Sequence, residues 1–204
     1  MRPYLLIKHL LIQCLFLLSL SSIAESASHG IDNTIYMNQS QNTVESAENI
    51  FYFEDTTHQQ SLDNIQALDE NRWEHLPNNI ANFGFSDSAY WFSFELNNNG
   101  SEDLSLYVHI NYALLDKIDF YSLEKGQSPE HIQVGDMQAY HERPVDYPTF
   151  LLPLELKEKQ SKRILVRIET SGTLQVPISI WQKEAFLLNT QDSLFLYGCF
   201  LSAY

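Results

Sequence analysis

The stretch that most constrains the fold of this chain covers residues 82–96. Its first half brings Asn, Gly, Ser and Asp residues close together, which is the composition of a tight turn. In its second half every second side chain is large and apolar: Tyr90, Phe92, Phe94 and Leu96. Alternation with a period of two is typical of a β-strand that buries one face. The stretch therefore predicts a half-buried strand entered through a sharp corner.

The same alternation recurs along the chain and predicts an all-β fold. Runs with this pattern lie between turn residues at 104–110, 117–123, 131–134, 150–154, 163–169 and 174–180, and the continuous apolar run at 50–53 predicts one more strand. We expect only one short helix in this region, and it begins after Ser61 as its N-cap. About eight strands at this spacing favour a jelly-roll-like two-sheet β-sandwich. We place this domain at residues 49–182.

The loop after the central strand is short, so we expect the central strand and the next one to form a hairpin. Pairing of Leu96 with Leu104 would keep the apolar side chains of both strands on one buried face. The opposite face would then display Trp91, Tyr107 and His109 side by side.

The N-terminal region differs in composition from the predicted sandwich. Residues 1–24 carry two basic residues before an apolar run and end in small residues, a pattern typical of a secretory signal peptide. Residues 25–48 are rich in Ser, Asn, Gln and Glu, and we expect a flexible lead-in whose apolar residues 35–37 could form one short edge strand. Cys14 lies in the signal peptide and Cys199 near the C-terminus, so the exported domain cannot depend on disulfides.

The C-terminal region changes period after Trp181. Residues 183–193 predict a juxtamembrane helix, against which Trp181 would serve as a packing anchor. Residues 194–204 are almost uncharged but shorter than the ~20 residues that span a bilayer. They are either packed on the domain or the truncated start of a first transmembrane helix, and we favour the second.

The chain is strongly acidic, with a formal net charge of −14. Loss of the signal peptide would remove two basic residues, leaving 10 against 26 acidic ones and a net charge of −16. Such a surface repels polyanions, so we expect no nucleic-acid partner.

The sequence lacks a pattern typical of a catalytic or metal site. Asp116 and Asp119 lie three residues apart and would point to opposite faces of a strand, so they are not placed for joint acid–base chemistry. The histidines lack the spacing of a metal motif: His58, His75, His109, His131 and His141. We therefore predict no enzymatic activity for this chain, no cofactor and no metal ion.

Four segments together resemble one known family: residues 82–96, 114–121, the Arg143-Pro144 pair leading into 150–154, and 163–181. Their order and spacing resemble the type-2 extracellular domain of bacterial seven-transmembrane receptors with diverse intracellular signalling modules (7TMR-DISM). The resemblance implies a periplasmic jelly-roll domain, similar to carbohydrate-binding modules and anchored in the inner membrane. It also implies the receptor's own transmembrane bundle as a partner and a cytoplasmic output such as a diguanylate cyclase or a histidine kinase.

A sugar site needs aromatic rings that stack on C–H patches and polar groups that bind hydroxyls. The candidate ligand-binding residues are Trp91, Tyr107, His109, Asp119, Tyr121 and Arg143. Two of them have an alternative role, since Trp91 could be covered by the connection 136–148 and Arg143 could bind groups of the fold itself. The family resemblance implies a sensor of carbohydrates or related small molecules, and these residues permit such a ligand without requiring it. The alternative is a module that docks another periplasmic domain or a second copy of itself.

Overall fold

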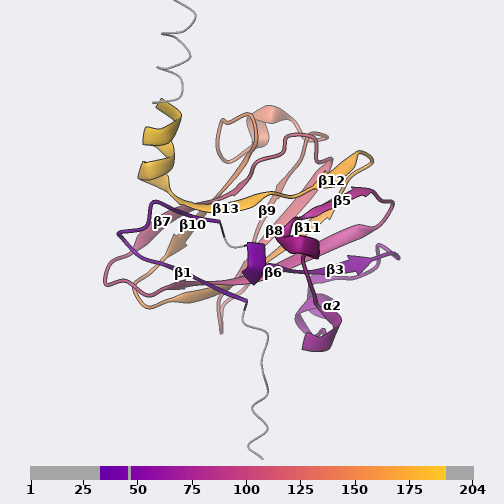
Figure 1. Cartoon of the computed structure of the whole chain (residues 1–204), viewed down its shortest axis with the longest axis horizontal. Helices are drawn as coiled ribbons and strands as arrows, with labels where there is room; N and C mark the ends of the chain where they lie inside the picture. Colours follow the sequence, from indigo (N-terminus) through magenta and orange to yellow (C-terminus); the bar gives the residue numbers. More distant parts are fainter. Residues whose placement is uncertain (1–32, 46, 192–204) are drawn as a thin grey trace, which may run out of the picture. The chain divides into compact units, whose positions relative to one another are not determined.

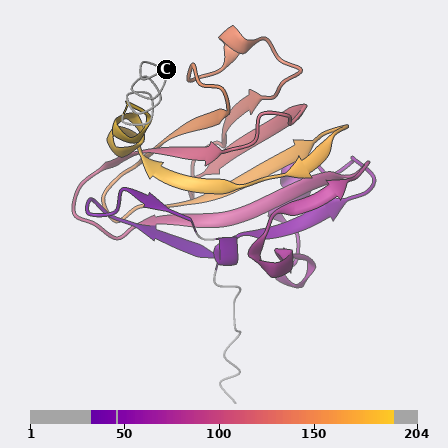
Figure 2. The same ribbon diagram turned by 45° about the horizontal axis from the view of Figure 1, so that its top comes forward.

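The strands predicted from alternation lie in two main sheets that face each other (Figures 1 and 2). The structure is a computed structural model and describes residues 33–45 and 47–191. It confirms the predicted two-sheet β-sandwich. The predicted signal peptide and the predicted start of a transmembrane helix lie outside the described residues.

The larger sheet has seven strands in the order β4-β3-β6-β11-β8-β9, with β1 paired in parallel to β6. These strands are β1 (Thr34–Met37), β3 (Phe51–Asp55), β4 (Glu74–His75), β6 (Ala89–Asn98), β8 (Lys117–Leu123), β9 (Glu130–Val134) and β11 (Ser161–Glu169). The strand β6 is the centre of this sheet because β3, β11 and β1 all pair with it.

The smaller sheet has four strands in the order β10-β7-β13-β2, and two further strands form a separate ladder. The four strands are β2 (Thr43–Val44), β7 (Leu104–Ile110), β10 (Phe150–Leu156) and β13 (Ile178–Gln182). The separate ladder consists of β5 (Asn82–Phe85) and β12 (Thr173–Gln175). The single run predicted at 174–180 is thus divided between two sheets, with Val176 and Pro177 between its halves.

Helical segments are short. They are η1 (Ala47–Asn49), α2 (Leu62–Gln66), η2 (Glu70–Arg72), η3 (Pro77–Asn79), η4 (Tyr140–Glu142) and the helical residues 183–191. The predicted cap of α2 is confirmed, since the Ser61 side chain accepts a hydrogen bond from the Asn64 backbone N–H. No helix among the described residues is long and apolar enough to cross a membrane.

The hydrophobic core fills the space between the two main sheets. Phe92, Phe94 and Leu96 of β6 point into it from the larger sheet, while Val108 and Ile110 of β7 point into it from the smaller one. All five side chains are fully buried. The predicted inward faces of both strands are therefore confirmed.

The predicted hairpin is wrong, because β6 and β7 lie in different sheets. The loop at 99–103 carries the chain across the core, so Leu96 pairs with Ile35 and Lys162, and Leu104 pairs with Leu156. The two apolar faces meet across the core instead of lying side by side. As a consequence, outward residues of β6 and outward residues of β7 lie on opposite outer faces of the sandwich.

The sandwich begins earlier than the predicted boundary at residue 49. β1 pairs with the end of β6, and β2 pairs with β13, so part of the predicted lead-in supplies strands to both sheets. Met37 and Ile35 of β1 are buried in the core. Their burial explains why the apolar residues 35–37 occur within the otherwise polar residues 25–48.

Candidate functional site: a pocket at the edge of the sandwich

The six residues predicted to bind ligand fall into three separate environments. Trp91, Asp119 and Tyr121 lie together on the outer face of the larger sheet. Tyr107 and His109 lie on the outer face of the smaller sheet. Arg143 lies in the connection between β9 and β10. The structure thus brings three of the six together but does not unite the set.

On the larger sheet, the side chains of the predicted residues pack against one another and against neighbouring side chains. Tyr121 stacks on His131 with ring centroids 4.5 Å apart and lies nearly parallel to Trp91 at 6.0 Å. Trp91 is only 1 % exposed, and the guanidinium carbon of Arg167 lies 5.9 Å from its ring. Burial and the nearby Asp119 carboxylate raise the pKa of Tyr121. A ring that is covered in this way offers little surface for stacking on a sugar.

The Asp119 carboxylate is likewise engaged. It accepts hydrogen bonds from His131 Nε2 at 3.0 Å and from Gln133 Nε2 at 2.7 Å, and it forms ion pairs with Lys117 and Arg167. With four partners, Asp119 neutralises positive charge within the sheet and has little capacity left for a ligand.

On the smaller sheet, Tyr107 and His109 belong to a cluster that we call the Phe186 cage. Four rings each contact the Phe186 ring edge-on, with centroids 5.1–5.7 Å apart, and form this cage: Tyr107, His109, Tyr147 and Trp181. Phe186 belongs to the helical residues 183–191, so the contact of Trp181 with the following helix is as predicted. Burial lowers the pKa of His109 to about 4, and its Nε2 lies 2.8 Å from the Thr149 hydroxyl.

Arg143 holds the connection between β9 and β10 in place. Its guanidinium carbon lies 4.8 Å from the Tyr140 ring and 4.7 Å from the Phe150 ring. Its Nη1 donates to the backbone oxygens of Tyr147 and Pro148. Tyr147 of this connection packs in the Phe186 cage on the smaller sheet.

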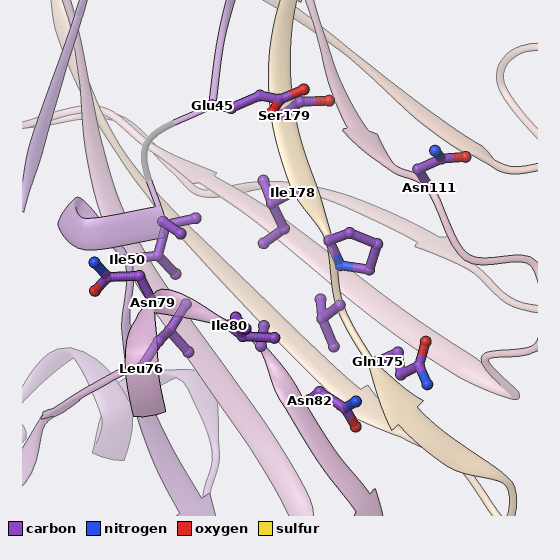
Figure 3. A pocket seen from close by; sticks show the side chains of 14 residues that line it. Glu45, Ile50, Leu76, Asn79, Ile80, Asn82, Asn111, Gln175, Ile178 and Ser179 are labelled. Carbon is purple, nitrogen blue, oxygen red and sulfur yellow. The ribbon is translucent and has the colours of Figure 1, made fainter.

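A concave site lies elsewhere, at the edge of the sandwich where β13 starts (Figure 3). This edge pocket has a volume of about 420 Å³. Its apolar lining residues are Ala47, Ile50, Leu76, Ile80, Ala81, Val176, Pro177 and Ile178. Its polar lining residues are Glu45, Asn79, Asn82, Asn111, Gln175 and Ser179.

Backbone hydrogen bonds tie the walls of the edge pocket together. Val176 N–H donates to Ala81 at 2.8 Å, and Asn111 N–H donates to Pro177 at 3.0 Å. Asn79 adopts a φ of 57°, in the left-handed region that Asn tolerates better than most residues. The pocket is therefore built by loops that are fixed to the ends of β5, β7 and β13.

Several polar side chains of the edge pocket are available to a ligand. Within the described part of the chain, the side-chain amides of Asn79, Asn111 and Gln175 have no hydrogen-bonding partner. Among the described residues that line the pocket, Glu45 supplies the one carboxylate, and none is Lys, Arg, His or aromatic. The site suits an uncharged molecule with hydroxyl groups on one side and an apolar surface on the other.

Sequence reasoning missed this pocket because its residues come from segments that are far apart in the chain. Asn79, Asn82 and Asn111 occur in stretches whose composition is typical of turns, and turn formation explains such residues without a ligand. Among the described residues no group of three or more His, Cys, Asp or Glu could hold a metal ion.

Comparisons with solved structures find only distant likenesses. BtGH115A, a 4-O-methyl-α-glucuronidase, has 14 % identity and a TM-score of 0.29, and the match covers 50 % of this chain and 14 % of that one. The Cry4Aa toxin of Bacillus thuringiensis has 12 % identity and a TM-score of 0.28, with 50 % and 19 % covered. TmCBM61, solved with β-1,4-galactotriose, has 10 % identity and a TM-score of 0.30, with 69 % and 81 % covered. These values are too low to assign a function.

The comparison with curated proteins finds no match. A protein-family comparison, in contrast, matches residues 47–182 to the family described as 7TMR-DISM extracellular 2. The match covers β3 to β13, which leaves out only β1 of the larger sheet and β2 of the smaller one, and it includes most of the edge pocket. Since it spans well over half of the chain, this protein belongs to the 7TMR-DISM extracellular 2 family, a family of extracellular domains of membrane receptors.

Proposed function

We propose that this chain is the periplasmic sensor domain of a bacterial membrane receptor and binds a small, uncharged, hydroxyl-rich molecule in the edge pocket. Carbohydrates of one or two sugar units are the ligand class that we favour. The receptor would be anchored in the inner membrane and would carry a cytoplasmic output such as a diguanylate cyclase or a histidine kinase. The domain itself would carry out no catalysis.

The edge pocket is the observation that supports this proposal best. Its volume of about 420 Å³ lies in the range of small-molecule sites, roughly 300–1,000 Å³. The free amides of Asn79, Asn111 and Gln175 offer both donors and acceptors to hydroxyl groups. Pro177 and Ile178 offer an apolar wall to the C–H face of a sugar ring.

The charge of the pocket limits the ligand class further. Glu45 is the single charged residue in the described part of the lining, and the whole chain has a net charge of −14. A carboxylate or phosphate would enter this pocket without a cationic partner, which is unfavourable. We therefore infer that neutral sugars bind better than acidic ones.

The direct test measures the melting temperature of the chain with glucose, galactose, maltose and lactose. A ligand at 100 times its dissociation constant stabilises the folded state by ~2.7 kcal/mol, which raises the melting temperature of a domain of this size by roughly 5–10 °C. We expect Asn111→Ala or Gln175→Ala to weaken binding about tenfold, since each removes one or two hydrogen bonds. Gln127→Ala, which changes an exposed glutamine outside the pocket, is the matched control.

Two outcomes would contradict this site. Loss of the ligand effect in a folded Tyr121→Ala variant, with Asn111→Ala unaffected, would place binding on the outer face of the larger sheet. Absence of any shift with these sugars would argue against the ligand class and favour an interaction module.

The interaction module is the second candidate, and one observation favours it. Three large apolar side chains are well exposed: Phe85, at the end of β5, at 83 %, and Leu114 and Met137, in two loops, at 61 % and 80 %. Their segments are linked, since Phe85 pairs with Thr173, the Thr170 hydroxyl donates to the Leu114 carbonyl, and Met137 N–H donates to the Asp116 carbonyl. If this surface docks a second copy, sedimentation should detect dimers that Phe85→Ser abolishes.

A further inference from the structure

Ser179 belongs both to the edge pocket and to the surroundings of the Phe186 cage. It is one of the polar residues that line the pocket, as is Glu45, and both are labelled in Figure 3. In the β7–β13 ladder it lies directly opposite His109, a member of the cage. The short strand β13 therefore begins at the pocket and ends at the cage.

A hydrogen bond joins the two sites along β13. Trp181 Nε1 donates to Ser179 Oγ at 3.0 Å. The two residues are two positions apart in the strand, so both side chains point to the outer face of the smaller sheet. The Trp181 ring in turn meets the Phe186 ring edge-on, with centroids 5.6 Å apart.

Phe186 is the residue that docks the helical residues 183–191 on the sandwich. It is 5 % exposed, whereas its neighbours Leu187 and Leu188 are 48 % and 63 % exposed. Since the other members of the cage surround the same ring, any change in the position of Trp181 alters the packing around this one buried side chain.

We propose that the Ser179 hydroxyl couples the edge pocket to the docking of residues 183–191, through Trp181 and Phe186. The coupling rests on the proposed function, because it assumes that a ligand occupies the pocket. A hydroxyl both donates and accepts, and Ser179 already accepts from Trp181. A ligand oxygen that accepts a hydrogen bond from the Ser179 hydroxyl would polarise this hydroxyl and strengthen the hydrogen bond that it accepts from Trp181. Ligand binding would then tighten the docking of the helix.

The first test needs no ligand. In Ser179→Ala the Trp181 indole loses its acceptor, and we expect the amides of residues 183–191 to exchange with solvent about fivefold faster. That factor corresponds to ~1 kcal/mol, the worth of one neutral hydrogen bond. In ¹H–¹⁵N spectra the Trp181 indole signal, assigned with Trp181→Phe, should move upfield, while the Trp73 and Trp91 signals stay in place.

Ser105→Ala is the matched control, since Ser105 lies outward on the same sheet but bonds Glu155 instead of a cage residue. Trp181→Phe breaks the same bond from the other side and should accelerate exchange by a similar factor, which keeps the test valid if Ser179→Ala fails to fold. If Ser179→Ala exchanges like Ser105→Ala and leaves the indole signal unchanged, the coupling is overturned.

The second test uses the sugar that gives the largest thermal shift among glucose, galactose, maltose and lactose. It should slow exchange of residues 183–191 in the wild type but not in Trp181→Phe, which leaves the pocket lining intact. Equal protection in both proteins would overturn the coupling. Failure of all four sugars to bind would count against the ligand class alone, because the ligand-free variants test the coupling separately.

Discussion

At the residue scale, His109 shows how burial decides the role of a polar side chain. It is 7 % exposed, and burial lowers its pKa to about 4, so it is neutral in the folded protein near pH 7. In the unfolded chain the pKa returns to ~6.5. The unfolded state therefore binds a proton first as the pH falls, and the contribution of His109 to stability is lost between pH 6.5 and about 4.

We expect this loss to reach about 2 kcal/mol of unfolding free energy between pH 6.5 and pH 5, at 1.36 kcal/mol per pKa unit. Urea titrations at several pH values measure it. His109→Gln should flatten this part of the profile, whereas the exposed His141→Gln should not. The pKa of His58 is raised by its bond to Glu169, so His58 acts in the opposite direction. The comparison between variants therefore isolates His109, and equal pH profiles would refute its role.

Arg143 provides the second prediction at this scale. Its guanidinium plane lies against two aromatic rings while its Nη1 bonds two backbone carbonyls, a geometry that an ammonium cannot reproduce. We expect Arg143→Lys to lower the unfolding free energy by about 1–2 kcal/mol, since each cation–π contact at an exposed site contributes ~0.5–1 kcal/mol and Arg143 makes two such contacts. Arg72→Lys is the control, because exposed Arg72 meets only the Phe53 ring. A loss of unfolding free energy no larger than that of the control would contradict this role of Arg143.

At the element scale, the turn after β9 depends on a glycine. Gly135 has a φ of 155°, and a Cβ at this position would lie 2.1 Å from the backbone oxygen of Asp116. Gly126 also has a positive φ, 83°, but nothing lies within 4 Å of its Cβ position. We expect Gly135→Ala to cost at least about 2 kcal/mol more than Gly126→Ala, whose cost is the backbone strain of ~1–2 kcal/mol alone. Chemical denaturation of both variants measures this difference. Equal costs would show that the backbone at Asp116 moves aside at little cost and would contradict the prediction.

The elements also show what the sequence could predict. Alternation identified the inward residues of β6 and β7, because side-chain direction is a local property of a strand. It could not identify strand partners, because a short loop can close a hairpin or cross the core. The wrong partner for β6 brought Trp91 and Tyr107 to one face, although the sandwich separates them. The edge pocket could not be predicted at all, since residues as far apart as Glu45 and Ser179 meet there only through the fold.

At the scale of the whole molecule, charge should select among the ligands of the edge pocket. The chain has a net charge of −14, and the pocket adds the Glu45 carboxylate without any lining cation. Glucuronate and galacturonate differ from glucose and galactose by one carboxylate, so they form matched pairs of ligands. We expect each acid to bind at least about tenfold more weakly than its neutral sugar, which corresponds to ~1.4 kcal/mol.

The weaker binding of the acidic sugars has two sources, the distant surface charges and the Glu45 carboxylate. Changes of salt concentration and a single substitution separate them. The long-range part should shrink between 0.05 and 0.5 M NaCl, because the field of distant surface charges is screened beyond about 10 Å at 0.1 M. Glu45→Gln removes the local part and should reduce the difference in affinity between each acidic sugar and its neutral counterpart. Glu48→Gln is the control, because Glu48 is exposed near the pocket but does not line it, and it should leave this difference unchanged. Calorimetric titration of both sugar pairs gives the four affinities. If the acids bind as tightly as the neutral sugars in the wild type, the ligand lies at another site, where the cations Lys117, Arg167 or Arg143 can meet its carboxylate.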